Sequence, residues 1–144
     1  MFVNNLKIPA ELVAQVDAGL WPRTTPDVQI QTIRPLVQPH VVKTFAPDES
    51  GIILYAPPFH TIQNELDERR YTAEQLAVHD IAPDKTVLIA DFGLGSDTAV
   101  ALDFRLGTAN PAVIRLQWRL PDQSNRWVKV ANSFSEFWDM LHVA

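Results

Sequence analysis

The sequence predicts one α+β domain over residues 1–144, in which helices from the two ends of the chain cover a mainly antiparallel sheet. The length of the chain fits a single domain. Its C-terminal third holds four strand-like runs separated by Gly, Pro, Asn and Asp, a pattern typical of an antiparallel meander. The first and last segments instead carry apolar residues at helical spacing. Short N-terminal strands are expected to complete the sheet.

The first expected element is a helix over residues 9–18. Pro9 suits the first turn of a helix, and Leu12 and Val16 lie four residues apart on one face. Gly19 is placed to end this helix.

Three extended segments are expected next. Two are short and cover residues 28–33 and 41–45, where neighbouring prolines would confine any strand to a short or edge position. The third, GIILYAPPF at residues 51–59, has the character of a buried strand that ends at Pro57 and Pro58.

Helical turns are expected in the middle of the chain. Thr61 is placed to cap a helix that carries Leu66. Thr72 and Gln75 have the spacing of a capping box, and Leu76 would supply the buried side chain of that turn.

The four strands of the predicted meander are TVLIAD, DTAVALDF, AVIRLQW and RWVKVA, at residues 86–91, 97–104, 112–118 and 126–131. Apolar residues alternate with more polar ones along them, which predicts one buried face. That face would hold Val100, Leu102, Phe104, Ile114, Leu116, Trp118, Val128 and Val130.

A terminal helix is expected to cover this buried face. Ser133 and Glu136 have the spacing of a capping box. The apolar residues behind them follow the i, i+3, i+4, i+7 pattern of an amphipathic helix, and they are Phe134, Phe137, Trp138 and Leu141.

The order of these parts over residues 86–142 resembles the SUKH superfamily of Smi/Knr-type domains. Members show an aliphatic strand, a Gly and Asp turn, a strand that ends near an Asp, and a closing "sFeeFl" helix. This chain has TVLIADFG, GLGSD and DTAVALDFR, and then the helix residues Ser133, Phe134, Glu136, Phe137 and Leu141. Upstream, the segment IPAELVAQVDAGLWPR is only loosely similar, because Gly19 and Trp21-Pro22 replace the Gly pair often found there.

The resemblance implies a role without catalysis. Many bacterial members of the superfamily are immunity proteins that bind and neutralise a toxin domain, often a nuclease. Others are regulatory interaction modules.

Composition excludes several other classes of function. The net charge of −5 argues against nucleic acid as the main partner, since phosphate binding needs clustered Lys and Arg. The absence of cysteine excludes disulfides, thiolate metal sites and a cysteine nucleophile. The N-terminus has no basic leader and no window is apolar enough to span a membrane, so a cytoplasmic protein is expected.

The sequence offers no convincing catalytic or cofactor motif. Asp91-Phe92-Gly93 matches the metal-binding triplet of protein kinases, but the chain is too short to be one. GLGSDT has two of the three glycines of a dinucleotide fingerprint and precedes a strand rather than a helix. The histidines His40, His60, His79 and His142 lie too far apart in sequence for paired ligands. We therefore expect no metal, no cofactor and no enzymatic activity.

A partner-binding rim is predicted at one end of the sheet. Connections in a meander alternate between the two ends, so the turn after Asp91 and the loop after Trp118 should emerge together. The polar residues expected there are Asp91, Ser96, Asp97, Arg119, Asp122, Asn125 and Arg126. Alternatively, these are ordinary turn residues facing solvent. Trp127, on the opposite face from Val128, is either covered by another element or exposed for a partner.

The leading hypothesis is a protein-binding domain, most concretely an immunity protein that neutralises a toxin domain. The alternatives are a regulatory or scaffold interaction module of the same fold and a small enzyme of unrecognised mechanism.

Overall fold

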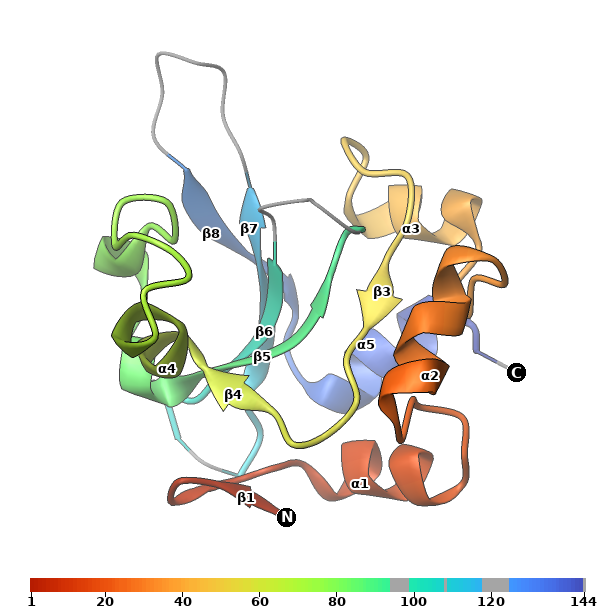
Figure 1. Ribbon diagram of the computed structural model, residues 1–144, viewed down its shortest axis with the longest axis horizontal. Coiled ribbons are helices and arrows are strands. Elements are labelled where there is room, and N and C mark those ends of the chain that lie inside the picture. The colour runs from red at the N-terminus through yellow and green to blue at the C-terminus, as the bar shows by residue number, and fades with distance from the viewer. Residues whose placement is uncertain (94–98, 108, 118–124, 144) are drawn as a thin grey trace.

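The four strands expected in the C-terminal third form the centre of the main sheet (Figure 1). The computed structural model describes residues 1–93, 99–107, 109–117 and 125–143. The strands are β5 (Thr86–Asp91), β6 (Ala99–Asp103), β7 (Ala112–Gln117) and β8 (Arg126–Ala131). Each pairs antiparallel with the next, which confirms both the meander and the α+β class.

Two further strands extend the sheet along the outer edge of β5. β3 (Ile53–Leu54) pairs with Asp91 and Ala90, and β4 (His60–Thr61) pairs with Leu88 and Val87. β3 lies in the segment expected to be extended, residues 51–59, and β4 follows directly after it. The Pro57-Pro58 bond between the two strands is cis. A separate two-stranded sheet joins β1 (Phe2–Val3) to β2 (Leu6–Lys7).

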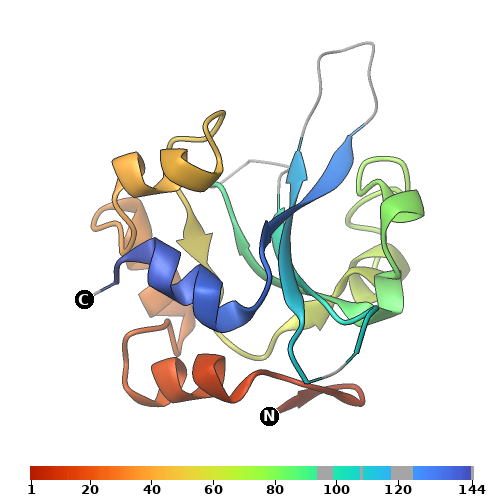
Figure 2. The same ribbon diagram turned by 180° about the vertical axis from the view of Figure 1, so that it is seen from behind.

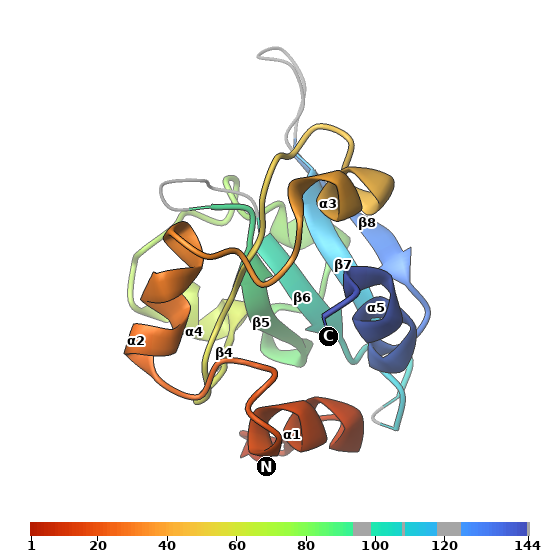
Figure 3. The same ribbon diagram turned by 90° about the vertical axis from the view of Figure 1, so that its right-hand side faces the viewer.

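Helices from both ends of the chain cover one face of the main sheet (Figures 2 and 3). They are α1 (Ala10–Asp17), α3 (Pro39–Phe45) and α5 (Phe134–Leu141), and α5 contacts both of the others. Edge-to-face aromatic pairs support this packing, with ring centroids 5.7 Å apart in both Trp21–Phe134 and Phe45–Phe137. The two terminal helices are confirmed.

The other face of the sheet is covered as well, so the expectation of a single buried face is wrong. Val100 and Leu102 pack under α1, α3 and α5, whereas Ile114 and Leu116 face the opposite side. There they meet α4 (Ile62–Asp67) and the segment that leads to the short 3₁₀ turns η2 (Val78–Asp80) and η3 (Pro83–Lys85). The alternation along β6 suggested one buried face because the residues between its large apolar side chains are alanines. These alanines are buried too, and they pack on the second face. Trp118 lies outside the described residues.

Trp127 belongs to this second core. Its indole Nε1–H donates a hydrogen bond of 2.7 Å to the carbonyl oxygen of Leu76. Trp127 is therefore covered by another element and is not exposed for a partner.

The extended segments expected over residues 28–33 and 41–45 are helical, which corrects the sequence prediction. The first falls in α2 (Thr25–Gln29) and the 3₁₀ turn η1 (Ile30–Thr32), and the second falls in α3. The nearby prolines begin helices here rather than limit strands, because a proline in the first turn lacks only an N–H that has no helical partner. Pro26 and Pro39 occupy such positions.

Side-chain caps fix where several helices begin. Thr24 and Asp27 form a full capping box at α2. The predicted caps are confirmed too: Thr61 Oγ1 accepts from the Asn64 N–H at 3.1 Å, and Ser133 Oγ accepts from the Glu136 N–H at 3.1 Å. Within the described residues, no helix is long and apolar enough to cross a membrane.

Candidate functional site

The sheet end at which β5 finishes and β8 begins is where the rim was predicted (Figure 1). Asp91 pairs with Ala99, and Gln117 pairs with Arg126, so these four strand ends lie at the same end of the sheet. Of the predicted rim residues, Ser96, Asp97, Arg119 and Asp122 lie outside the described residues. The rim as a whole stays a prediction, and the three described members can be placed.

Asp91 is held in a hydrogen-bond network rather than standing free at the rim. Its carboxylate accepts the Tyr55 hydroxyl at 2.6 Å and the Gly93 N–H at 2.8 Å. Burial raises the pKa of Asp91, while the two hydrogen bonds act in the opposite direction. Burial also raises the pKa of Tyr55 well above its usual range, and the neighbouring Asp91 charge adds to the effect.

The other two described rim residues lie at the start of β8, which is at the opposite edge of the sheet from β3 and β5. Asn125 donates a hydrogen bond of 3.0 Å to the carbonyl oxygen of Gln75, and Arg126 is exposed at the start of β8. β8 is three strands from β5, which corresponds to roughly 14 Å at the usual strand spacing. Asp91 therefore shares one end of the sheet with Asn125 and Arg126 but is separated from them by β6 and β7.

A feature that sequence reasoning missed lies along the outer edge of β3. The Gln31 side chain donates a hydrogen bond of 2.9 Å to the carbonyl oxygen of Leu54 and accepts one of 2.9 Å from the Leu54 N–H. Gln31 is only 2% exposed, so its amide occupies the position that a neighbouring strand would take. No local pattern signals this role, because the contact spans 23 positions of sequence.

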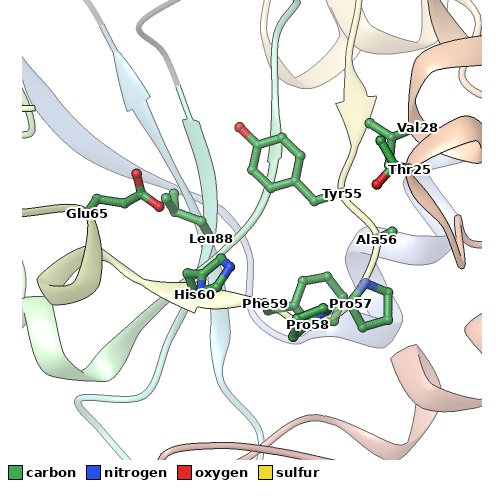
Figure 4. Close-up of a pocket in the computed structure, with 10 residues that line it drawn as sticks. All are labelled: Thr25, Val28, Tyr55, Ala56, Pro57, Pro58, Phe59, His60, Glu65 and Leu88. Atoms are coloured by element: carbon green, nitrogen blue, oxygen red, sulfur yellow. The ribbon is translucent and has the colours of Figure 1, made fainter. Parts of the chain in front are cut away.

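The α2–η1 segment that supplies Gln31 also borders two cavities. The first has a volume of about 310 Å³ and lies between α2, the end of β3, β4 and α4 (Figure 4). Its walls include Thr25, Val28, Tyr55, Phe59, His60, Glu65 and Leu88. The second has a volume of about 330 Å³ and extends from η1 to the sheet end, where Phe92 and Gly93 line it.

Two isoleucines of the same segment point into solvent. Ile30 is 45% exposed and Ile33 is 76% exposed. In a 3₁₀ turn, side chains three residues apart line up on one face. We call these two isoleucines, together with the mouths of the two cavities, the α2–η1 face. The two isoleucines are not among the residues that line these cavities, but their neighbours Val28, Gln31 and Thr32 are. Exposed apolar side chains near such cavities are typical of interaction sites.

An ion pair fixes the chain that borders the second cavity. Arg115 of β7 is buried, and its Nη2 lies 2.9 Å from Asp48 Oδ1. The Arg115 guanidinium also sits 5.8 Å from the centre of the Phe92 ring. The segment before β3 is thus tied to the sheet close to Ser50 and Gly51, which line the cavity.

In the part of the chain that the structure describes, no group of three His, Cys, Asp or Glu side chains could hold a metal ion. No family model, curated protein or solved structure matches the chain. The geometry of the α2–η1 face and the sheet end is therefore the basis for assigning a function.

Proposed function

We propose that this chain is a protein-binding domain and that the α2–η1 face is part of its binding surface. The observation that carries the proposal is the exposed pair Ile30 and Ile33 on a turn that borders two cavities. Exposed apolar side chains can insert into a partner, and neighbouring cavities can accept the partner's side chains. Such buried contacts supply most of the binding energy at the centre of an interface.

The specific role we propose is that of an immunity protein, which neutralises a toxin domain by binding it. This step rests on the resemblance of residues 86–142 to the SUKH superfamily. A regulatory or scaffold interaction module of the same fold is the alternative. Ser96, Asp97, Arg119 and Asp122 remain proposed contacts at the neighbouring sheet end.

A binding role without catalysis is supported by Tyr55 and Asp91, two titratable residues near the α2–η1 face that are hydrogen-bonded to each other. Tyr55, which lines the first cavity, donates a hydrogen bond of 2.6 Å from its hydroxyl to Asp91. A tyrosine hydroxyl is protonated at neutral pH, and burial raises the pKa of Tyr55 further. Tyr55 therefore acts as a hydrogen-bond donor to Asp91. Both groups hold the wall of the cavity in shape.

The test uses the protein as bait, followed by measurement of the affinity of any captured partner for two variants. Ile33→Glu places a charge in the proposed interface, and Leu106→Glu makes the same change at a fully exposed leucine on the β6–β7 connection. We expect Ile33→Glu to weaken binding by about 30-fold, which corresponds to the ~2 kcal/mol of an interface hot spot. Leu106→Glu should change the affinity less than about twofold.

Equal affinities for the two variants would remove the α2–η1 face from the proposal. A single partner that binds tightly in a 1:1 complex and loses its toxicity on co-expression would support the immunity role. Several partners of micromolar affinity would favour the scaffold alternative.

A further inference from the structure

The first cavity contains a carboxylate that is nearly shielded from bulk water. Glu65 lies on α4, and its side chain is only 8% exposed. Figure 4 shows its carboxylate pointing from α4 toward Leu88 and Tyr55. A buried carboxylate is costly unless a cation or hydrogen-bond donors compensate for its lost hydration.

The protein itself compensates Glu65 only in part. Arg70 Nη1 lies 3.3 Å and 3.4 Å from the two carboxylate oxygens of Glu65, which is long for an ionic hydrogen bond. Arg70 Nη2 makes its short contact with Glu68 instead, at 2.5 Å. One arginine is thus shared between two carboxylates, and the group of three keeps a net negative charge. Among the described residues that line the cavity there is no Lys or Arg, and His60 is the one side chain that can carry a positive charge.

An aromatic ring stands beside this carboxylate. The Tyr55 ring lies between Glu65 on one side and Val28 on the other (Figure 4). Its hydroxyl is committed to Asp91, so the ring is held in place and the charge of Asp91 lies behind it. Cations bind favourably over the face of a tyrosine ring, and more strongly where water is excluded.

We infer that this cavity is a binding site for a guanidinium or alkylammonium group, with Glu65 as the counter-ion and the Tyr55 ring as the wall. The volume of about 310 Å³ lies at the small end of the range for ligand pockets, roughly 300–1,000 Å³. It suits a cationic head with a short methylene stem, while Leu88, Phe59 and the two prolines contact the stem.

The inference deepens the proposed function, on which it rests for the source of the cation. The net charge of −5 favours a basic partner, whose Arg or Lys side chain would enter the cavity. A free amine of the same chemistry is the other source, and the experiment separates the two.

The test is a titration of the ¹⁵N-labelled protein followed by amide chemical shifts. The probe is N-acetyl-arginine amide, and the matched control is N-acetyl-citrulline amide, which has nearly the same shape without the charge. We expect the arginine probe to shift the amides of Tyr55, Glu65 and Leu88 to saturation and the citrulline probe to leave them in place. Glu65→Gln should weaken binding of the arginine probe by about tenfold or more, while Asp67→Asn, the same loss of one negative charge at an exposed position of α4, should change it by less than about twofold.

A second pair of variants keeps the test decisive if Glu65→Gln fails to fold. Val28→Lys on the opposite wall places an ammonium group at the cavity and should block the probe. Val28→Met has a similar length without charge and should leave binding intact. Probe binding that is unchanged by Val28→Lys would overturn the inference.

The outcomes also separate this inference from the proposed function. If the arginine probe competes with the captured partner, a partner side chain fills the cavity. If the probe binds but does not compete, the source is a free amine. If no probe moves the cavity amides while the partner still binds, the cavity site is wrong and the protein-binding function stands. If the probe binds and Ile33→Glu leaves partner affinity unchanged, the cavity site stands and the α2–η1 face fails.

Discussion

At the scale of single residues, two aspartates show that the surroundings of a carboxyl group decide whether its pKa is raised or lowered. Asp91 accepts hydrogen bonds yet has a raised pKa, because the loss of hydration on burial is the largest influence on it. Asp27 is fully exposed and has a lowered pKa, for which the hydrogen bond from the Arg23 N–H is the largest cause. The same side chain thus favours the protonated form in one place and the ionised form in the other.

The two aspartates should therefore make opposite contributions to stability as pH changes. A pKa above the unfolded value of 3.8 means that the folded state binds the proton more tightly, so the Asp91 contribution is full below that value and declines as pH rises through the folded pKa. Asp27 contributes above 3.8 and loses its contribution as pH falls. We expect the stability of the wild type relative to Asp91→Asn to fall with rising pH, and relative to Asp27→Asn to increase.

Urea unfolding of the three proteins at several values between pH 3 and pH 7 would measure both trends. Parallel curves for wild type and Asp91→Asn would show that burial does not shift the Asp91 pKa as described.

Gln31 gives a second prediction at this scale. Gln31→Ala removes both hydrogen bonds to Leu54 and leaves a buried N–H and C=O without their partner. Such a loss costs about 1–3 kcal/mol for each unsatisfied group. Gln29→Ala, at an exposed position of the same segment, should cost less than about 0.5 kcal/mol. Chemical denaturation would show the difference, and equal stabilities would mean that water replaces the Gln31 amide without loss.

At the scale of elements, the four strands of the meander and the terminal helices could be predicted from the sequence, whereas β1, β2, β4, α2 and α3 were not. β5 and β8 alternate or run apolar between clear turn residues, and α5 has four apolar residues at helical spacing behind a Ser cap. The segments of α2 and α3 contain valine and isoleucine next to proline, a composition shared by short edge strands and helix N-termini. For α2 the Thr24 and Asp27 capping box was the available signal. α3 has no side-chain cap, and Pro39 in its first turn was the only local signal for it.

The terminal helix should contribute heavily to stability through one residue. Phe137 is fully buried and meets both Phe45 and Phe134. Phe137→Ala should destabilise the protein by about 3–5 kcal/mol, a typical cost for removing a buried aromatic ring. Ser135→Ala, on the exposed side of the same helix, should be within about 0.5 kcal/mol of the wild type. An unchanged thermal midpoint for Phe137→Ala would mean that α5 is dispensable for the core.

At the scale of the whole molecule, the sequence predicted the sheet but only part of the candidate site. The meander fixed which strand ends share one end of the sheet, so Asp91 and Arg126 could be placed there. The α2–η1 face could not be predicted, because its contacts join Gln31 to Leu54 and Val28 to the region of Glu65 across long stretches of chain. Such contacts leave no periodic pattern in a single sequence.

The overall charge yields a prediction for the whole molecule. With a net charge of −5, encounter with a basic partner should be accelerated by long-range attraction. The association rate should therefore fall as salt rises, because screening shortens the Debye length to roughly 8 Å at 0.15 M ionic strength. The dissociation rate should change much less. Stopped-flow mixing at several salt concentrations would measure both rates, and an association rate independent of salt would exclude a basic partner surface.

At each edge of the sheet, one outer strand has a side chain hydrogen-bonded to its backbone. Gln31 covers Leu54 of β3, and Asp80 accepts the Trp127 N–H of β8 at 3.1 Å. Fibre growth and strand exchange between copies begin at free backbone edges. A second molecule would have to displace these side chains before its own backbone could pair there. Whether another chain can pair with either edge of the sheet therefore depends on the side chains of Gln31 and Asp80. Substitution of these two residues could open the edges to a partner strand without any change in the strands themselves.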